Sequence, residues 1–312
     1  MGRARGANAK LAGAFETTYG TPPATGLIGL PFVSSNLGAE QGLLESDLLG
    51  QGREPYDPTY DVVTNDGDVV VPVDVRYIGY WLKLLFGAPA TTGSDLYTHV
   101  FSSGAANLPS MAIETQLPDV PSYAMGYGYR ANQLRISMQR RGLLNATVSL
   151  VGKGEEAPSA TSVAGTLLTA LALDRFAQAT GEIKREGVTL GSIVSADVNF
   201  TNNLDKIETI QPDGEIEDAD GGIAMATGSM TARFANNTLV TDATSQEPVE
   251  LSWSWAFGAD FTLTLTCPRV FLPRVKRPIQ GPGGVQATFN WQASGEGGPS
   301  LIAELINDVA SF

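Results

Sequence analysis

Apolar and polar side chains alternate along much of this chain, in stretches of about five to ten residues. In 133–139, Leu134, Ile136 and Met138 alternate with polar residues, so one face of this segment is apolar. A period of two predicts β-strands with one buried face. By this criterion we expect strands at 97–101, 110–117, 133–139, 143–152, 192–201, 223–233, 249–257, 260–267 and 285–293.

Two segments show the helical spacing of three or four residues instead. Over 76–87 this spacing ends at Gly87, which predicts a short amphipathic helix. In 299–312, Pro299 precedes apolar residues with the same spacing, which predicts a C-terminal helix. The apolar positions are Ile78, Trp81, Leu82 and Leu85 in the first segment and Leu301, Ile302, Leu305, Ile306 and Val309 in the second.

Glycine and proline suggest where the chain turns. The 312 residues include 35 Gly and 18 Pro, which is typical of a chain with many turns and short strands. In 62–75, two valine-rich runs flank Asn65-Asp66-Gly67-Asp68, which predicts a hairpin whose turn uses the positive φ of Gly67. Arg140-Arg141-Gly142 predicts the turn between the strands at 133–139 and 143–152.

Two other segments lack a regular apolar pattern. Residues 1–26 are rich in Gly, Ala, Thr and Pro, so we expect an extended arm that docks on a neighbouring subunit rather than on its own core. Residues 153–165 are small and polar and include Pro158, which favours a linker.

The sequence contains an internal similarity. Residues 142–159 resemble 283–300 at a constant offset of 141, with these identical pairs: Gly142/Gly283, Ala146/Ala287, Thr147/Thr288, Gly154/Gly295, Glu155/Glu296, Pro158/Pro299 and Ser159/Ser300. Upstream, Gly67 matches Gly228 at an offset of 161, and Asn36-Leu37 resembles Asn203-Leu204 at 167. The falling offset places about 20 additional residues in the first copy, between Gly67 and Gly142. We interpret this as a tandem duplication; the alternative is a chance alignment of two β-rich segments.

The net charge and the scarcity of cysteine and histidine exclude several classes of function. The formal net charge is −13, opposite to what a protein that grips nucleic acid or an anionic membrane carries. A single cysteine, Cys267, excludes an internal disulfide, and a single histidine, His99, excludes a multi-histidine metal site. No apolar run is long enough to span a membrane, and no secretory signal is recognisable. We therefore expect no catalytic residues, no cofactor and no metal ligands.

Four local patterns are candidates for functional sites. The acidic loop 211–222 could hold a hard cation but lacks the spacing of a calcium loop, so a solvated loop is favoured. The glycine-rich 281–287 leads into a strand and is read as a turn rather than a phosphate cradle. Paired carboxylates for glycoside hydrolysis remain an alternative without a specific pair. Two basic clusters are read as subunit contacts against acidic loops: Arg130, Arg135, Arg140 and Arg141, then Arg269, Arg274, Lys276 and Arg277.

Five longer segments together span nearly the whole chain: ANAKLAGAFETTYGTPP, VVVPVDVRYIGYWLKLLFG, LRISMQRRGLLNATVSLVGKGE, FTNNLDKIETIQPDGEIEDADGGIAMATGSMTARF and PIQGPGGVQATFNWQA. These segments resemble the tail tube (major tail) proteins of long-tailed phages. The resemblance implies β-sandwich or barrel units, each with a short flanking helix, in rings that stack into a hollow tube. It also implies that strands join across subunits to line a channel for the genome, and it supplies no catalytic residues.

Combining both lines of reasoning, we expect a mainly β fold of two tandem units plus an N-terminal arm. The expected divisions are an arm at 1–29, a first unit at 30–155, a linker at 156–187, a second unit at 188–298 and a helix at 299–312. Three such chains would close a pseudo-sixfold ring; the alternative is a hexamer whose second halves decorate the tube.

The same interpretation specifies partners and location. The partners would be other copies of the chain, the tape measure, tail terminator and distal tail proteins, and phage DNA in transit, with no membrane. The place would be the virion tail, after assembly in the cytoplasm of the host bacterium. A β-sandwich carbohydrate-active enzyme and an adhesin module are the alternatives.

Overall fold

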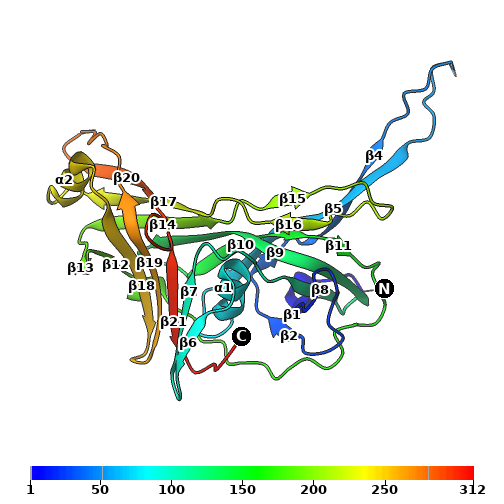
Figure 1. Ribbon diagram of the computed structural model, residues 1–312, viewed down its shortest axis with the longest axis horizontal. Coiled ribbons are helices and arrows are strands. Elements are labelled where there is room, and N and C mark those ends of the chain that lie inside the picture. Colours follow the sequence, from blue (N-terminus) through cyan, green and yellow to red (C-terminus); the bar gives the residue numbers. More distant parts are fainter. Residues whose placement is uncertain (1, 51, 280) are drawn as a thin grey trace.

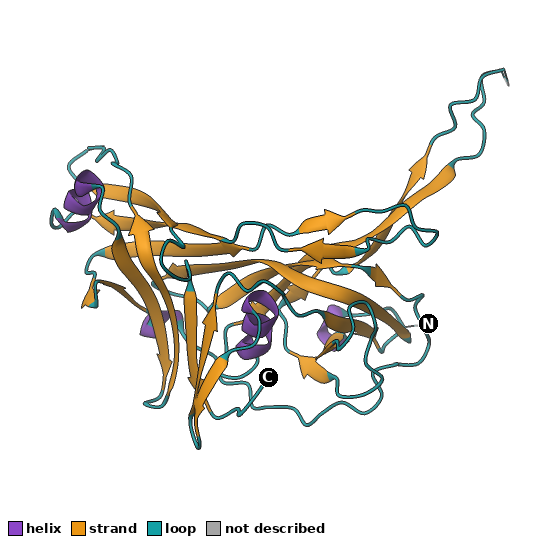
Figure 2. Cartoon of the chain, in the orientation of Figure 1, coloured by secondary structure: helices purple, strands orange, loops and turns teal. Residues whose placement is uncertain are grey.

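The computed structural model describes residues 2–50, 52–279 and 281–312. These residues form mostly antiparallel strands, with two short α-helices, α1 (Ile78–Phe86) and α2 (Thr238–Ser245) (Figure 2). The mainly β fold expected from the alternating pattern is confirmed. The strands are β1 (Lys10–Phe15), β2 (Ile28–Leu30), β3 (Ser34–Ser35), β4 (Gly38–Leu44), β5 (Thr59–Pro72), β6 (Ala90–Gly93), β7 (Tyr97–Ser102), β8 (Met111–Leu117), β9 (Ser122–Gln139), β10 (Asn145–Gly152), β11 (Gly154–Glu155), β12 (Glu182–Arg185), β13 (Val188–Thr189), β14 (Ile193–Thr201), β15 (Asp205–Ile207), β16 (Asp218–Asp220), β17 (Met225–Arg233), β18 (Val249–Phe257), β19 (Phe261–Phe271), β20 (Gln286–Ala293) and β21 (Ile302–Asn307).

One antiparallel sheet, here called the wide sheet, crosses the molecule (Figure 1). Its strands lie in the order β5, β10, β9, β14, β17 and β20, and β3 and β4 pair with the other edge of β5. Strand β9 from the first half of the chain pairs with β14 from the second half. Because of this pairing, the two halves of the chain share one sheet.

Smaller groups of strands and helix α1 pack against the apolar face of the wide sheet. One group contains β2, β1, β8 and the first half of β9; the other has the order β12, β18, β19, β21, β7 and β6. Trp253 on β18 stacks on Trp291 on β20, with ring centroids 5.0 Å apart. Phe86 at the end of α1 contacts Phe200 on β14 at 4.8 Å. These aromatic contacts join the two layers in one buried core.

Strand registers in the two halves correspond pair by pair. Strand β10 pairs with β5 so that Leu150 lies opposite Gly67, and β20 pairs with β17 so that Trp291 lies opposite Gly228. Adding 141 to each β10 number and 161 to each β5 number converts one register into the other throughout. At one end, the pair Asn145–Pro72 becomes Gln286–Arg233. At the other end, the pair Val151–Asp66 becomes Gln292–Thr227. These are the two offsets seen in the sequence at Gly142/Gly283 and Gly67/Gly228.

A matching side-chain contact locates the upstream correspondence. The Asp68 N–H donates to Asn36 Oδ1 at 2.5 Å, and the Ser229 N–H donates to Asp197 Oδ2 at 2.9 Å. Asn36 and Asp197 differ by 161, so the residue corresponding to Asn36 is Asp197. The expected match of Asn36-Leu37 with Asn203-Leu204 is therefore wrong. Helices α1 and α2 follow nearly the same offset, and the additional residues of the first half include the β6–β7 hairpin between α1 and β8.

The expected hairpin at 62–75 is wrong, because β5 runs unbroken from Thr59 to Pro72. Gly67 lies in the middle of this strand, and its φ is not positive. A Cβ at Gly67 would lie 2.9 Å from the carbonyl oxygen of Asn36. The glycine is needed for a close backbone approach rather than for a turn.

The expected helix at 299–312 is also wrong. Residues Ile302–Asn307 form β21, which lies between β19 and β7 and pairs with both. Leu301, Ala303 and Leu305 are fully buried, which is the period of a strand. The sequence Leu-Ile-Ala-Glu-Leu-Ile fits both periods over this length, and pairing on both sides decides in favour of the strand.

The N-terminal arm docks on its own chain, contrary to expectation. Strand β1 pairs with β8 on one side and β2 on the other, and Leu11 and Ala12 are buried. Backbone pairing on both sides supplies the order that the weak apolar pattern does not predict. The segment expected as a linker at 156–187 ends in β12, whose Ile183 pairs opposite Trp253 of β18.

Candidate functional site

The second face of the wide sheet is polar from one edge to the other. Along each strand, residues that point into the core alternate with Ser, Thr, Asn, Gln and a few charged residues. We call this surface the polar face. Its members include Asp68 on β5, Thr147 and Ser149 on β10, Gln133, Arg135 and Ser137 on β9, Asp197 and Asn199 on β14, Ser229 and Thr231 on β17, and Thr288 and Asn290 on β20.

Neighbouring strands interact across the polar face through neutral groups and one carboxylate. Gln133 Nε2 donates to Asn199 Oδ1 at 2.7 Å, and the Thr231 and Thr288 hydroxyls are 3.0 Å apart. The Ser229 hydroxyl donates to Asp197 Oδ1 at 2.7 Å. Such cross-strand pairs hold the register of the sheet and leave a hydrated surface.

Charges of both signs lie on the polar face. Asp66, Asp68 and Asp197 lie on this face together with Arg135 and with Arg233 at the end of β17, and Lys206 pairs with Asp66. A face of hydroxyls and amides with few cations offers a phosphate backbone few charge contacts.

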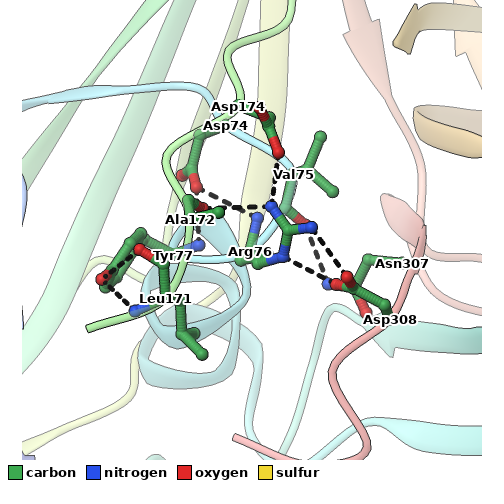
Figure 3. Close-up of polar contacts among 9 residues, drawn as sticks. All are labelled: Asp74, Val75, Arg76, Tyr77, Leu171, Ala172, Asp174, Asn307 and Asp308. Carbon is green, nitrogen blue, oxygen red and sulfur yellow. Dashed lines mark hydrogen bonds and ion pairs between the residues drawn. The ribbon is translucent and has the colours of Figure 1, made fainter. Parts of the chain in front are cut away.

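Arg76 joins three distant segments beside helix α1 (Figure 3). Its guanidinium contacts Asp174 Oδ2 at 2.6 Å and both carboxylate oxygens of Asp308 at 2.7 Å, and it donates to the Ala172 carbonyl at 3.1 Å. These ion pairs raise the pKa of Arg76 and lower that of Asp308. Asn307 adds a bond from Nδ2 to the Val75 carbonyl at 2.8 Å. Arg76 therefore holds the segment that connects the halves, and the end of β21, against the start of α1.

Asp74 precedes this helix and is fully buried. Its carboxylate accepts the backbone N–H groups of Arg76, Tyr77 and Ile78 at 2.9–3.0 Å. Burial raises the pKa of Asp74 to about 6, and the three backbone bonds oppose that rise. Asp74 is a buried cap that secures the start of α1.

The acidic loop expected as solvated at 211–222 contacts the first half of the chain. Arg130 Nη1 lies 2.8 Å from Asp218 Oδ1, and the Tyr127 hydroxyl donates to Glu215 Oε1 at 2.5 Å. Before the loop, Lys206 on β15 pairs with Asp66. Among the described residues, no cluster of three or more His, Cys, Asp or Glu could hold a metal ion. The loop acts as a polar contact between the halves, and Arg130 meets an acidic partner within its own chain.

His99 and Cys267 lie in the interior. The Nε2–H of His99 donates to the Val309 carbonyl at 2.8 Å, and its Nδ1 is 2.8 Å from the Thr91 hydroxyl. Burial raises the pKa of the Cys267 thiol, which keeps it protonated and unreactive. The described helices include none long and apolar enough to cross a membrane.

The polar face could be anticipated from alternation at 133–139 and 285–293, whereas Arg76 was missed because Asp174 and Asp308 lie far away in sequence. Asp74 was missed although it had a local signal, an Asp just before the helical spacing. The missed helix α2 had a signal: shifting α1 by 161 predicts a helix at 239–247.

Comparison with known proteins agrees with this architecture. No curated protein matches the sequence. The family model described as phage tail tube protein matches residues 6–293, nearly the whole chain. A wide β-sheet with a hydrated face fits a structural role in a virion tail. The chain belongs to the phage tail tube protein family.

Proposed function

We propose that this chain polymerises into stacked rings that form the tail tube, with the polar face of the wide sheet turned toward the channel. The observation that supports this most directly is the polar face itself, continuous across strands from both halves. The phage genome would pass along this face without specific binding. Hydroxyls and amides would keep the channel wall hydrated, and the small number of cations on it would limit salt-dependent retention of DNA.

In this proposal the two halves are tandem units of one fold, at about 10–155 and 182–293. The matching registers of β10 with β5 and of β20 with β17 support it. A closed ring needs a fixed rotation per unit, and six units turn by about 60° each. Three chains would then form one pseudo-sixfold ring. The contact between β9 and β14 is the join between two units inside one chain.

We further propose a structural rather than catalytic role, with the other tail proteins as partners. The tape measure would occupy the channel during assembly in the host cytoplasm, and the terminator and distal tail proteins would contact the two ends of the tube. The family match supports a place in the virion tail, and the interior positions of His99 and Cys267 support the non-catalytic role.

Electron microscopy of the purified protein, with rotational averaging of end-on views, tests the proposal. We expect rings or tubes in which six similar densities per layer repeat with threefold symmetry. Six full-length chains per layer would overturn the trimeric ring while leaving the tube. Discrete particles under all assembly conditions would overturn the tube itself.

A further inference from the structure

The correspondence between the two halves breaks at one place. In the first half, residues 130–139 of β9 pair with β10 on one side and β14 on the other. The positions shifted by 141 are 271–280, and Gln292 lies opposite Phe271 just as Val151 lies opposite Arg130. Beyond Phe271 the described residues 272–279, here called the open segment, have no strand assignment. Gly142 and Gly283 keep the same offset after the segment, so both versions have the same length.

The open segment keeps part of the side-chain pattern of the strand it corresponds to. Val275 and Ile279 occupy the places of Leu134 and Met138, and Lys276 occupies the place of Arg135, whereas Arg277 occupies the place of the buried Ile136. Leu134 and Met138 are buried, whereas Ile279 is 80% exposed. An apolar side chain this exposed, at the place of a buried residue in the corresponding strand, indicates a missing partner.

Strand β14, which pairs with β9, also has a counterpart, and that counterpart lacks a neighbouring strand on one side. Strand β14 corresponds to residues 34–40 at the offset of 161, and these residues pair with β5 alone in the described chain. The Asn36 N–H donates to the Asp68 carbonyl, so Ser35, Leu37 and Ala39 direct their backbone groups away from β5. At this edge Glu155 Oε2 lies 3.8 Å from the position that a Cβ at Gly38 would take. A second strand at this edge would displace the Glu155 side chain.

We propose that, when rings form, the open segment of one chain becomes a strand between its own β20 and residues 35–40 of the next chain. This inference rests on the proposed ring and specifies its seam. Shifting the β9–β14 register gives the pairs Ser35 with Ile279, Asn36 with Pro278, Leu37 with Arg277, Gly38 with Lys276, Ala39 with Val275 and Glu40 with Arg274. The partner is a second copy of this chain.

Proline and charge both fit this register. Pro278 occupies the place of Ser137, whose carbonyl accepts from Gln178 on the side away from β14. The missing N–H of Pro278 would therefore face its own chain and leave the seam ladder intact. Glu40 lies opposite Arg274, where the internal join has Thr201 opposite Gln133. The seam between chains thus has a charge pair that the internal join lacks.

Cysteine cross-linking tests the register. Glu40 and Arg274 form a pair without ladder hydrogen bonds, for which the Cα separation is about 4.5 Å, inside the range for a disulfide. Oxidised rings of the double variant Glu40→Cys, Arg274→Cys should give interchain disulfides and a ladder that ends at three chains. The control Gln41→Cys, Arg274→Cys should link far less, because a one-residue slip places the side chains on opposite faces.

The outcomes distinguish a failure of the proposed seam from a failure of the proposed ring. Rings without enhanced linkage of the first variant over the control would overturn the seam and leave the proposed function. A ladder that ends at six would support the seam and overturn the trimer. If neither rings nor tubes form with the unsubstituted chain, the proposed function and the seam both fail.

Charge reversal gives an independent measurement. Glu40→Arg or Arg274→Glu alone should raise the concentration needed for assembly several-fold at low salt, and the double reversal should restore it. Hydrogen exchange of the amides at 274–277 and 279 should slow at least tenfold on assembly. Equal protection before and after assembly, or no rescue by the double reversal, would contradict the proposal.

Discussion

Asp74 makes the stability of the chain depend on pH in an unusual direction. Its carboxylate is buried beside α1, and burial raises its pKa from 3.8 to about 6. Between these two pH values the native state keeps a proton that the unfolded state has released. Raising the pH through this window therefore destabilises the native state, and above about pH 7 the cost is constant.

The size of the effect follows from the shift. A difference of about two pKa units corresponds to about 3 kcal/mol of unfolding free energy. The variant Asp74→Asn cannot ionise, so it lacks this pH dependence. It also loses one of the acceptors for the backbone N–H groups of Arg76, Tyr77 and Ile78, which lowers its stability by an amount that does not vary with pH.

Urea unfolding of the dispersed chain, followed by far-UV circular dichroism at pH 4, 5, 6, 7 and 8, measures this dependence. The stability of the unsubstituted chain relative to Asp74→Asn should fall by about 2 kcal/mol from pH 4 to pH 7, because the unfolded-state carboxyl is already partly ionised at pH 4. Asp308→Asn is the matched control with the opposite sign. Arg76 lowers the pKa of Asp308, so its contribution is present at neutral pH and is lost on acidification. A flat or rising difference for Asp74→Asn would refute the reasoning.

Two further predictions concern packing. Leu305→Ala should lower the unfolding free energy by about 2–5 kcal/mol, because Leu305 is fully buried on β21. Glu304→Ala on the same strand should change it by less than about 1 kcal/mol. Equal effects of the two variants in urea unfolding would contradict the burial argument. Gly228→Ala should destabilise the chain by more than about 1 kcal/mol, because the new Cβ would lie 2.1 Å from the Asp197 carbonyl oxygen. Gly221→Ala is the control, because a Cβ at Gly221 meets nothing within 4 Å. A Gly228→Ala variant as stable as Gly221→Ala would show that the strands separate at little cost.

Local patterns could predict most strands but not how they pair. Alternation located β18 and β20 within one residue, and helical spacing located α1. The error at 299–312 arose because its apolar residues fit both the helical and the strand period. The error at Gly67 arose because the close approach of the Asn36 carbonyl depends on the folded structure and leaves no local pattern. Pairings such as β9 with β14 join segments that no local pattern connects.

In the candidate site too, local sequence predicts some features, whereas contacts between distant residues cannot be predicted. The polar face could be anticipated because each strand contributes its own polar positions, as Arg135 and Ser137 do. The Arg76 contacts could not, because Asp174 and Asp308 are 98 and 232 residues away along the chain. The tandem similarity is intermediate: its offsets of 141 and 161 agree with the strand registers residue by residue, whereas the offset of 167 at Asn36-Leu37 does not.

The β6–β7 hairpin has a consequence for the accuracy of folding. Repeated units within one chain are prone to misassembly, since a strand of one copy can take the place of its counterpart in the other. The hairpin occurs in the first half without a counterpart between α2 and β18, and β7 pairs with β21 from the opposite end of the chain. This pairing gives the two halves different partners. The added strands therefore mark the first copy as distinct from the second and disfavour an exchange of strands between them.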